Sequence, residues 1–325
     1  MSRIGMTTTV PVEIILAAGQ VPVDLNNIFI SDNQASGLVE AAEDAGYPRN
    51  ICGWIKGLYS VVVSGGNIDK VIAVTQGDCS NTHALMETFQ LAGIEIIPFA
   101  FPFDRDYDLL RLQMDKLIQL LGTRWKDVQT VKHRLDAVRK KVAEIDRLTW
   151  QENMVSGWHN HLYQISCSDF NGNVAEFEQS VDHFLLQAKA APEFDEDIRL
   201  GYIGVPPIFT DLYSYLESAG ARVVFNEVQR QFAMPFPVDD IVEQYRLYTY
   251  PYGVFDRIED IKAEIEKRNL DGIIHYVQSF CFRQIEDMIF REKLDVPILT
   301  IEGDKPGKVD ARTKLRIDSF VEMLR

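Results

Sequence analysis

The sequence predicts an α/β protein of two Rossmann-like or flavodoxin-like lobes, each with a parallel sheet, joined by a helical middle region. Three observations lead to this prediction. Strand and helix patterns alternate before residue 106, they alternate again after residue 196, and the segment between them has a helical pattern. We therefore expect an N-terminal lobe over residues 1–106, a helical middle region over 107–195 and a C-terminal lobe over 196–325.

The first lobe contains a strand–helix–strand unit. The stretch "VPVEIILAAG" has the pattern of a short helix with a glycine stop, and "QVPVDLNNIFI" has that of a strand. The segment "DKVIAVTQGDCSNTHALMETFQLAGIEIIPFAFP" then predicts a strand, a turn, a helix with a glycine cap, and a second strand. Because a crossover of this length joins parallel strands, we expect a parallel sheet.

The second lobe repeats this order of elements. "IRLGYIGVPP" predicts a strand, "IFTDLYSYLESAG" a helix and "ARVVFNEV" another strand. Further on, "LDGIIHYVQSF" predicts a strand, which a helix follows from about Phe282 to Lys293. A strand in "DVPILTIEGD" and a last helix from about Asp310 complete the lobe. The repetition suggests two lobes of similar construction.

The middle region is predicted to be helical from about Tyr107 to Ala191. Its stretch "WKDVQTVKHRLDAVRKKVAEIDRLTW" places charges along one face and apolar residues along the other, as a surface or bridging helix does. We interpret the Lys and Arg residues of this stretch as a solvated helix face rather than a binding patch.

Composition excludes several classes of protein. The 325 residues carry a formal net charge of −15, which disfavours nucleic acid as a partner but leaves room for a small phosphorylated ligand. No apolar run reaches the length of a membrane span, and the start "MSRIGMTTTVPVEIILAAG" does not resemble a secretory signal. We expect a cytoplasmic protein without nucleic-acid or membrane partners, whose four cysteines stay reduced.

Three of the cysteines occupy related places in the predicted fold. Cys79 follows a strand by the turn "QGD" and opens a helix, and Cys281 follows a strand by "QSF" and also opens a helix. Both places lie at the carboxyl edge of a parallel sheet, where such folds bind ligands. Cys52 heads a third helix in "GWIKGLYSVVVSGG". Helix N-termini favour the thiolate, the form that binds metal, but buried packing and a nucleophile remain alternatives. Cys167 lacks this context and is expected in the core.

The histidines leave a weaker signal. His159 and His161 in "GWHNHLY" could form a metal pair on one face of a strand, or be loop or surface residues. His83 lies one turn beyond Cys79 and could face the same site, or be a satisfied helix histidine. The motifs G-x-G-x-x-G, P-loop, G-x-S-x-G and H-E-x-x-H do not occur, so we expect no ATPase in this chain.

Four segments resemble the 2-hydroxyacyl-CoA dehydratase and benzoyl-CoA reductase family, in particular a 2-hydroxyglutaryl-CoA dehydratase D-component-like subunit. They are "TTVPVEIILAAGQVPVDLNN", "GDCSNTHALMETFQLAG", "GIIHYVQSFCFRQIEDMIFREKLDVPILTIEGD" and "RTKLRIDSFVEML". The resemblance covers both lobes in the same order and is weakest through the middle region. It implies a [4Fe–4S] cluster held by three cysteines, here Cys52, Cys79 and Cys281, with one iron open to water or to a thioester carbonyl.

The resemblance also implies a reaction and partners. A separate ATP-dependent iron–sulfur activator injects a low-potential electron, and the electron passes to an acyl-CoA thioester. The resulting ketyl radical anion expels the hydroxyl group, and the electron is recovered. The family works in anaerobic metabolism as pairs of related subunits, so we expect a homodimer or a heterodimer with a related subunit.

Residues beside the cysteines are candidates for substrate contact. If Cys79 and Cys281 come from different lobes, the cluster and the three sulfur atoms meet in the cleft between the lobes. Glu13, His83 and Ser279 are then candidate catalytic residues, and Asn26 and Gln278 candidate substrate-binding residues. A helix-surface carboxylate is the competing interpretation of Glu13.

Two other functions remain open from the sequence. The chain could be an electron-relay or scaffold subunit that holds the cluster without substrate chemistry. It could also be a two-lobed binding protein for a small metabolite, without a cluster.

Overall fold

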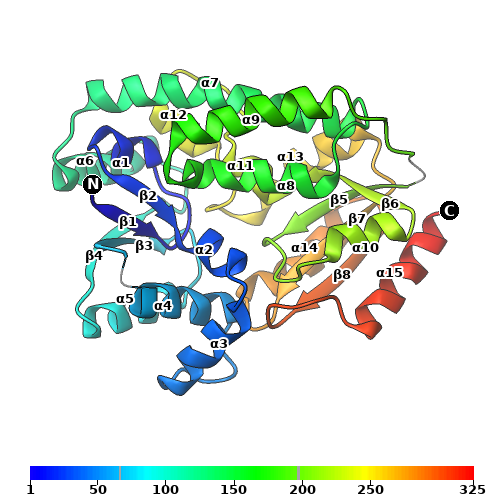
Figure 1. The fold of residues 1–325 in the computed structure, drawn as a ribbon, viewed down its shortest axis with the longest axis horizontal. Coiled ribbons are helices and arrows are strands. Elements are labelled where there is room, and N and C mark those ends of the chain that lie inside the picture. Colours follow the sequence, from blue (N-terminus) through cyan, green and yellow to red (C-terminus); the bar gives the residue numbers. More distant parts are fainter. Residues whose placement is uncertain (66, 196–197) are drawn as a thin grey trace. The chain divides into compact units, whose positions relative to one another are not determined.

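The computed structural model describes residues 1–65, 67–195 and 198–325 (Figure 1). These residues form two compact units, each containing one four-stranded, all-parallel sheet, as predicted. Unit 1 consists of Met1–Lys140, Ser166–Glu178 and Met234–Gly253, and unit 2 of Lys141–Ile165, Gln179–Ala233 and Val254–Arg325. Residues 107–195 are thus divided between the units. Gly66, at the end of one predicted helix, and the expected boundary at residue 196 lie outside the described residues.

The sheet of unit 1 has the order β2-β1-β3-β4. Its strands are β1 (Arg3–Met6), β2 (Val21–Asp24), β3 (Lys70–Gln76) and β4 (Glu95–Ala100). Most of β3 is apolar and buried, which is typical of a parallel strand covered on both faces. The helices of unit 1 are α1 (Val12–Ala17), α2 (Leu25–Ser31), α3 (Ala35–Asp44), α4 (Gly53–Gly65), α5 (Thr82–Leu91), α6 (Tyr107–Leu121) and α12 (Ile241–Leu247).

The prediction of a single strand over "QVPVDLNNIFI" was wrong beyond Asp24. The strand ends there, because the Asp24 carboxylate accepts a hydrogen bond from the backbone N–H of Asn26 at 2.9 Å and so caps the helix α2. Leu25 and Phe29, four residues apart, are the buried face of that helix. The apolar residues of this stretch fit a helix as well as a strand, and the capping aspartate decides between them.

The sheet of unit 2 has the equivalent order, β6-β5-β7-β8. Its strands are β5 (Ile198–Gly204), β6 (Ala221–Asn226), β7 (Gly272–Gln278) and β8 (Ile298–Gly303). Every residue of β7 is buried. The helices of unit 2 are α8 (Gly157–Ile165), α10 (Leu212–Ser218), α11 (Glu227–Phe232), α13 (Val254–Arg268), the 3₁₀ turn η3 (Phe282–Ile285), α14 (Glu286–Lys293) and α15 (Ala311–Leu324).

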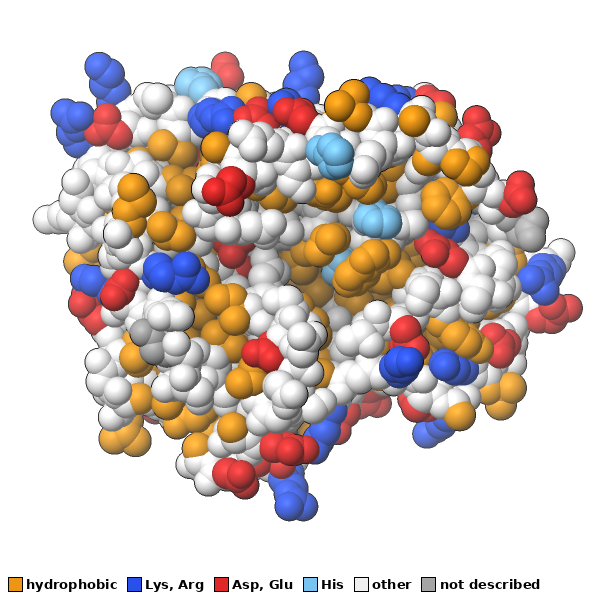
Figure 2. Space-filling view, in the orientation of Figure 1, with side chains coloured by type: hydrophobic (Ala, Val, Ile, Leu, Met, Phe, Trp, Pro, Cys, Tyr) orange, Lys and Arg blue, Asp and Glu red, His pale blue; other side chains and the backbone are white. Residues whose placement is uncertain are grey.

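The middle region is helical, as predicted. It contains α6, α7 (Trp125–Trp150), α8 and α9 (Val174–Ala188), with the short 3₁₀ turns η1 (Ser166–Ser168) and η2 (Phe170–Gly172). One face of α7 is buried through Val128, Leu135, Val138, Val142, Ile145 and Leu148, while most of its charged residues lie on the other faces. Acidic and basic side chains are interspersed on the face of the molecule drawn in Figure 2.

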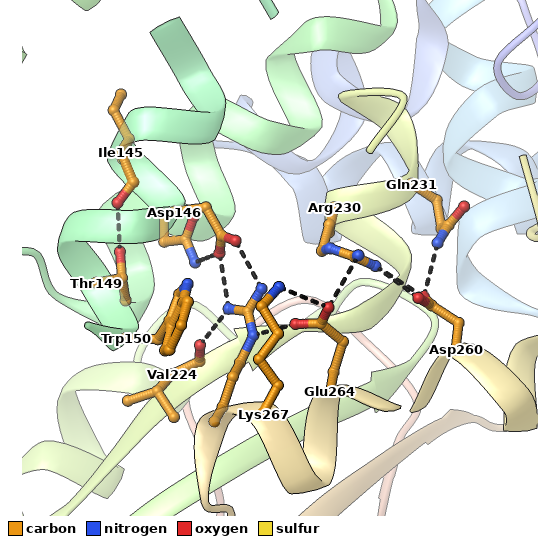
Figure 3. Close-up of polar contacts among 12 residues, drawn as sticks. Ile145, Asp146, Thr149, Trp150, Val224, Arg230, Gln231, Asp260, Glu264 and Lys267 are labelled. Atoms are coloured by element: carbon orange, nitrogen blue, oxygen red, sulfur yellow. Dashed lines mark hydrogen bonds and ion pairs between the residues drawn. The ribbon is translucent and has the colours of Figure 1, made fainter. Parts of the chain in front are cut away.

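A buried ionic network connects α11, α13 and the part of α7 that belongs to unit 2 (Figure 3). Arg268 of α13, which is fully buried, donates to both carboxylate oxygens of Asp146 in α7 at 2.9 and 2.6 Å and also pairs with Glu264. Arg230 of α11 donates to Asp260 at 2.8 Å and to Glu264 at 3.1 Å. Because each arginine faces two carboxylates, α7, α11 and α13 are held in one register.

Gly204 shows how closely β5 and β7 approach at their carboxyl ends. Its φ is +93°, and a Cβ atom placed on it would lie 2.2 Å from the backbone oxygen of Tyr276. A side chain at this position would therefore meet both a strained backbone and a backbone atom that cannot move away.

We expect Gly204→Ala to lower the free energy of unfolding by about 3 kcal/mol or more, because the new methyl group forces β5 and β7 apart. Urea denaturation of the purified variant measures this. Gly307→Ala is the matched control, since a Cβ at Gly307 meets nothing within 4 Å. Equal stability of the two variants would contradict the close approach.

Candidate functional site

The two sheets place a cysteine at equivalent positions. In unit 1, β1 connects to β2 on one side and β3 lies on its other side, so the strand order reverses at the carboxyl ends of β1 and β3. In unit 2 the same reversal falls at β5 and β7. Such reversal points are where open parallel sheets bind ligands. Each of β3 and β7 ends in the glutamine of a Q-x-x-C segment, Gln76 to Cys79 and Gln278 to Cys281.

The Cys281 loop is held by its own backbone. The N–H of Cys281 donates to the carbonyl of Gln278 at 3.0 Å, and the Cys281 carbonyl accepts from the N–H of Gln284 at 3.2 Å. Cys281 is thus the N-cap of η3, which continues into α14, so the helix predicted from Phe282 to Lys293 is present with a 3₁₀ first turn. The Cys281 side chain is partly exposed.

Phe280 adopts a conformation that is unusual for its type. Its φ is +65°, in the left-handed region, where a bulky side chain is a genuine outlier. The ring is 54 % exposed, so burial of the side chain does not offset the strain. Strained residues of this kind persist only where the surrounding contacts hold them, and they concentrate at functional sites.

Gln278 and Ser279, the candidates beside Cys281, bind the neighbouring strand β8 and the loop after it. The Gln278 amide donates to the carbonyl of Asp304 at 2.7 Å and accepts from the Tyr276 hydroxyl at 3.0 Å. The Ser279 hydroxyl donates to the carboxylate of Glu302 at 2.7 Å. The structure therefore gives both side chains a role in holding the carboxyl end of β7.

Cys79 lies in the turn before α5 rather than in its first turn. Its carbonyl accepts from the N–H of Thr82, the first residue of the helix, at 3.0 Å. His83 is exposed, and its Nε2 lies 2.9 Å from the carbonyl oxygen of Thr75 in β3. A ring nitrogen that meets a carbonyl must be the donor, so in the neutral ring Nδ1 is the acceptor. His83 thus lies over the carboxyl end of the strand that leads to Cys79.

Cys52 immediately precedes α4 and is buried. Its carbonyl accepts from the N–H of Lys56 at 3.3 Å, which places Cys52 at the start of the helix, as predicted. Lys56 is itself buried, and its ammonium group donates to Glu43 at 2.7 Å and to the carbonyl of Arg49 at 3.1 Å. These bonds tie the loop before Cys52 to the helices on either side of it.

Glu13 is buried, so the surface interpretation of this carboxylate was wrong. Its Oε1 accepts from Arg139 at 2.7 Å and from Gln244 at 3.1 Å, and its Oε2 accepts from Tyr245 at 2.8 Å. Burial by itself would raise the pKa of Glu13, but the charge and hydrogen bond of Arg139 bring it below the ordinary value. The carboxylate therefore stays ionised and joins α1 to α7 and α12 within unit 1.

Asn26 joins the carboxyl ends of β1 and β2. Its amide donates to the carbonyl of Thr7 and to the carboxylate of Asp24, both at 2.9 Å. Beside it lies a carboxyl pair that the sequence did not indicate, because Asp169 is 145 residues from Asp24 and accepts from the Asp24 backbone N–H at 2.8 Å. Burial, together with the charge of Asp24, raises the pKa of Asp169 to about 7. Asp169 can thus hold or release a proton near neutral pH.

Of the two interpretations of His159 and His161, the metal pair in a strand was wrong, and the alternative of loop or surface residues holds only for the exposed His159. His159 and His161 lie in the helix α8, where side chains two residues apart point in different directions. His159 is exposed, bonds Ser156 at 2.7 Å and stacks on Phe184. His161 is buried and lies 3.0 Å from both the Tyr213 hydroxyl and the Gln229 amide. Burial lowers the pKa of His161 to about 3, so the ring is neutral.

Neither a group of metal ligands nor a membrane span is found among the described residues. Within those ranges no three His, Cys, Asp or Glu side chains are grouped as ligands of one metal ion. In the same part of the chain, no helix combines the length and the apolar character needed to cross a membrane.

Glu13→Gln should lower the free energy of unfolding by about 3 kcal/mol, because Arg139 would remain buried without its counter-charge. Urea denaturation at pH 7 measures the change. Glu40→Gln, at an exposed position of α3, is the control and should change stability by less than about 0.5 kcal/mol. An unchanged stability in Glu13→Gln would remove the structural role given to the pair.

The depressed pKa of His161 predicts acid destabilisation of unit 2. The unfolded chain takes up the proton near the ordinary value of 6.5, whereas the folded protein does so only near 3, so stability is lost as the pH falls below 6.5. Wild type should lose about 2 kcal/mol more than His161→Gln between pH 7 and pH 5. Denaturation at the two pH values measures this, with the exposed His183→Gln as control. Equal losses in wild type and His161→Gln would contradict it.

Comparison with known proteins identifies the family of this chain. The family model described as 2-hydroxyglutaryl-CoA dehydratase, D-component, matches residues 7–324, nearly the whole chain. A search of curated proteins found no match. The matched residues include every strand of the two sheets except β1, and they include Cys52, Cys79 and Cys281. The chain belongs to the 2-hydroxyglutaryl-CoA dehydratase D-component family.

Proposed function

We propose that this chain is the iron–sulfur subunit of a cytoplasmic 2-hydroxyacyl-CoA dehydratase-like enzyme, with Cys52, Cys79 and Cys281 as ligands of a [4Fe–4S] cluster. The observation that carries the proposal is the equivalent placement of Cys79 and Cys281 after β3 and β7, at the reversal points of two sheets with the same strand order. Membership of the family supports it independently.

The donor set fits such a cluster. Iron–sulfur clusters require thiolates, and the N-terminal end of a helix stabilises a thiolate through its dipole and its unpaired N–H groups. Cys52 precedes the 13-residue helix α4, and Cys281 precedes η3 and α14. Cys167 provides the contrast, because burial raises the pKa of its thiol to about 12 and keeps it protonated. A bound [4Fe–4S] cluster with three protein ligands supplies an open iron and single-electron chemistry at low potential.

The chain's own residues supply position and protons. Gln278 and Ser279 hold the carboxyl end of β7 through Asp304 and Glu302, and so fix the approach to Cys281. His83 is the proposed proton carrier near Cys79, with Nδ1 as the accepting nitrogen in the neutral ring. Asn26 is proposed to act through the ordered ends of β1 and β2, and Glu13 through the position of α1, rather than by touching substrate.

The proposed substrate is an acyl-CoA thioester, and the reaction is dehydration of a 2-hydroxyacyl group or a low-potential reduction. The proposed partners are a related subunit, identical or not, and a separate ATP-dependent iron–sulfur activator. An experiment distinguishes this substrate-binding subunit from an electron-relay subunit, which would hold the same cluster without substrate chemistry. If an added 2-hydroxyacyl-CoA changes the EPR spectrum of the reduced protein, the thioester binds beside the cluster. An unchanged spectrum favours the relay.

Anaerobically purified protein should contain about four irons and four sulfides per chain, with broad absorption near 400 nm. Cys52→Ala, Cys79→Ala and Cys281→Ala should each lose most of this iron. Cys167→Ala is the matched control and should keep it, since the Cys167 thiol is buried and protonated. Iron and acid-labile sulfide analysis decides the matter. Loss of iron in Cys167→Ala with retention in Cys52→Ala would show that the ligand assignment is wrong, and a wild type without iron would refute the cluster.

A further inference from the structure

A buried arginine joins the helix that follows Cys281 to the carboxyl edge of the unit 2 sheet. Arg257 lies in α13 and is 1 % exposed. Its Nε and Nη2 donate to the two carboxylate oxygens of Glu227 at 2.7 and 2.9 Å. Its Nη1 donates to Glu286, the first residue of α14. One guanidinium group therefore holds carboxylates from two different helices.

Glu227 is fixed to the edge of the sheet. It follows β6 directly as the first residue of α11, and it is 1 % exposed. Its Oε2 also accepts from the backbone N–H of Gly204, the last residue of β5, at 3.1 Å. Because Gly204 lies against the Tyr276 carbonyl in β7, the carboxylate of Glu227 is tied to the reversal point of the sheet.

Arg257 contacts α14 on one face and in two places. Besides its bond to Glu286, its guanidinium lies 5.3 Å from the ring centre of Phe290, one turn further along the same helix. Glu286 also accepts from Arg283 of η3 at 3.2 Å. The contact therefore reaches back through η3 to its N-cap, Cys281.

The other side of the Cys281 loop is held independently. The carbonyl of Gln278 accepts from the Cys281 N–H at 3.0 Å and from the Gln284 side chain at 2.6 Å. Between these two supports lies Phe280 in its left-handed conformation. A loop that contains a strained residue relaxes when one of its supports can move, so both supports are needed to keep it in place.

We propose that Arg257 is a positioning residue for Cys281: it holds the start of α14 against the carboxyl edge of the sheet and so fixes the place of the Cys281 thiol. The role of that thiol as a cluster ligand rests on the proposed function. The positioning itself rests only on the contacts of Arg257, Glu227 and Glu286.

An arginine is required here because three directed bonds are made at once. Two N–H groups meet one carboxylate in parallel and a third points to another, an arrangement that the single ammonium group of lysine cannot reproduce. Burial would lower the pKa of Arg257, but the charges of Glu227 and Glu286 outweigh it and raise the pKa above the ordinary value. Arg257, Glu227 and Glu286 form, together with Arg283, a group of two cations and two anions whose charges balance.

The test compares Arg257→Lys with Arg268→Lys in the full-length protein. Both residues lie in α13, both are buried, and both bind two carboxylates, but Arg268 contacts Asp146 and Glu264 rather than α14. After anaerobic removal of iron by a chelator, iodoacetamide alkylates the thiols, and peptide mass spectrometry gives the rate at each cysteine. The readout is the ratio of the Cys281 rate to the Cys79 rate, since Cys79 belongs to unit 1 and serves as an internal standard.

Arg257→Lys should change this ratio at least about fivefold, because the loop leaves the conformation that its two supports impose, while Arg268→Lys should keep it within about twofold. The same preparation before chelation should lose iron to the chelator several times faster in Arg257→Lys than in Arg268→Lys. An unchanged ratio in folded Arg257→Lys overturns the inference, as does an equal change in Arg268→Lys.

Two further measurements keep the outcomes separate. If Arg257→Lys does not fold, Glu286→Gln, which leaves the Arg257–Glu227 pair intact, should move the ratio away from its wild-type value, and an unchanged ratio overturns the inference. Iron in the wild type is measured on the same samples. A wild type without iron refutes the proposed function while the alkylation ratio still decides on Arg257, and iron in the wild type with an unchanged ratio refutes Arg257 alone.

Discussion

Parallel pairing of the strands is the constraint on which each unit depends. Parallel strands cannot be joined by hairpins, so every connection crosses a face of the sheet and every strand ends at the same edge. The loops after β3 and β7 are therefore brought to the carboxyl edge whatever their own sequence. Since the two sheets share one strand order, the two Q-x-x-C segments occupy equivalent places without any similarity in the residues between Gln and Cys.

The crossover helices are fastened by arginines that bind carboxylates away from water. Arg139 meets Glu13 in unit 1, while Arg268 and Arg257 each meet two carboxylates in unit 2. Removing such charges from water costs free energy, so well-packed apolar residues in the same places would stabilise the fold as much as the ion pairs do. The ion pairs fix the relative orientation of the helices, because the rigid guanidinium group binds carboxylates in only a few geometries. Helices that must present a loop in one place gain from this more than helices that only cover a core.

The predictability of the fold and of the site differs for a physical reason. The strands β3, β5 and β7 are apolar runs bounded by turns, and this local pattern predicts a buried strand from the sequence alone. The end of β2 was predicted too late because Leu25 and Phe29 fit a strand or a helix. Asp24 is a residue type that commonly caps a helix, and it indicated the correct end of the strand. The region around His159 and His161 was predicted to be helical as a whole, but "GWHNHLY" taken alone is too short to show a helical period, which left a strand or a loop as its local interpretation.

The partners of buried charges leave no such local trace. Glu13 binds Arg139, which lies 126 residues away in the sequence, and the backbone of Asp24 binds Asp169, which lies 145 residues away. The Arg257 contact with Glu227 and Glu286 is likewise made only when α11, α13 and α14 have packed on the sheet. The positions of Cys52 and Cys281 at helix starts were predictable because a helix start is a local event. What holds those cysteines in place was not.

The way in which the chain is shared between the units has a consequence for its synthesis. Unit 1 takes its last segment from Met234–Gly253, and this segment supplies Gln244 and Tyr245 to the carboxylate of Glu13. A ribosome must therefore translate most of the message before the first unit has all its parts, while residues of the second unit are already emerging between them. The nascent chain must keep its early strands and apolar helix faces from aggregating over that interval. For the same reason, no single cut in the gene separates the two units.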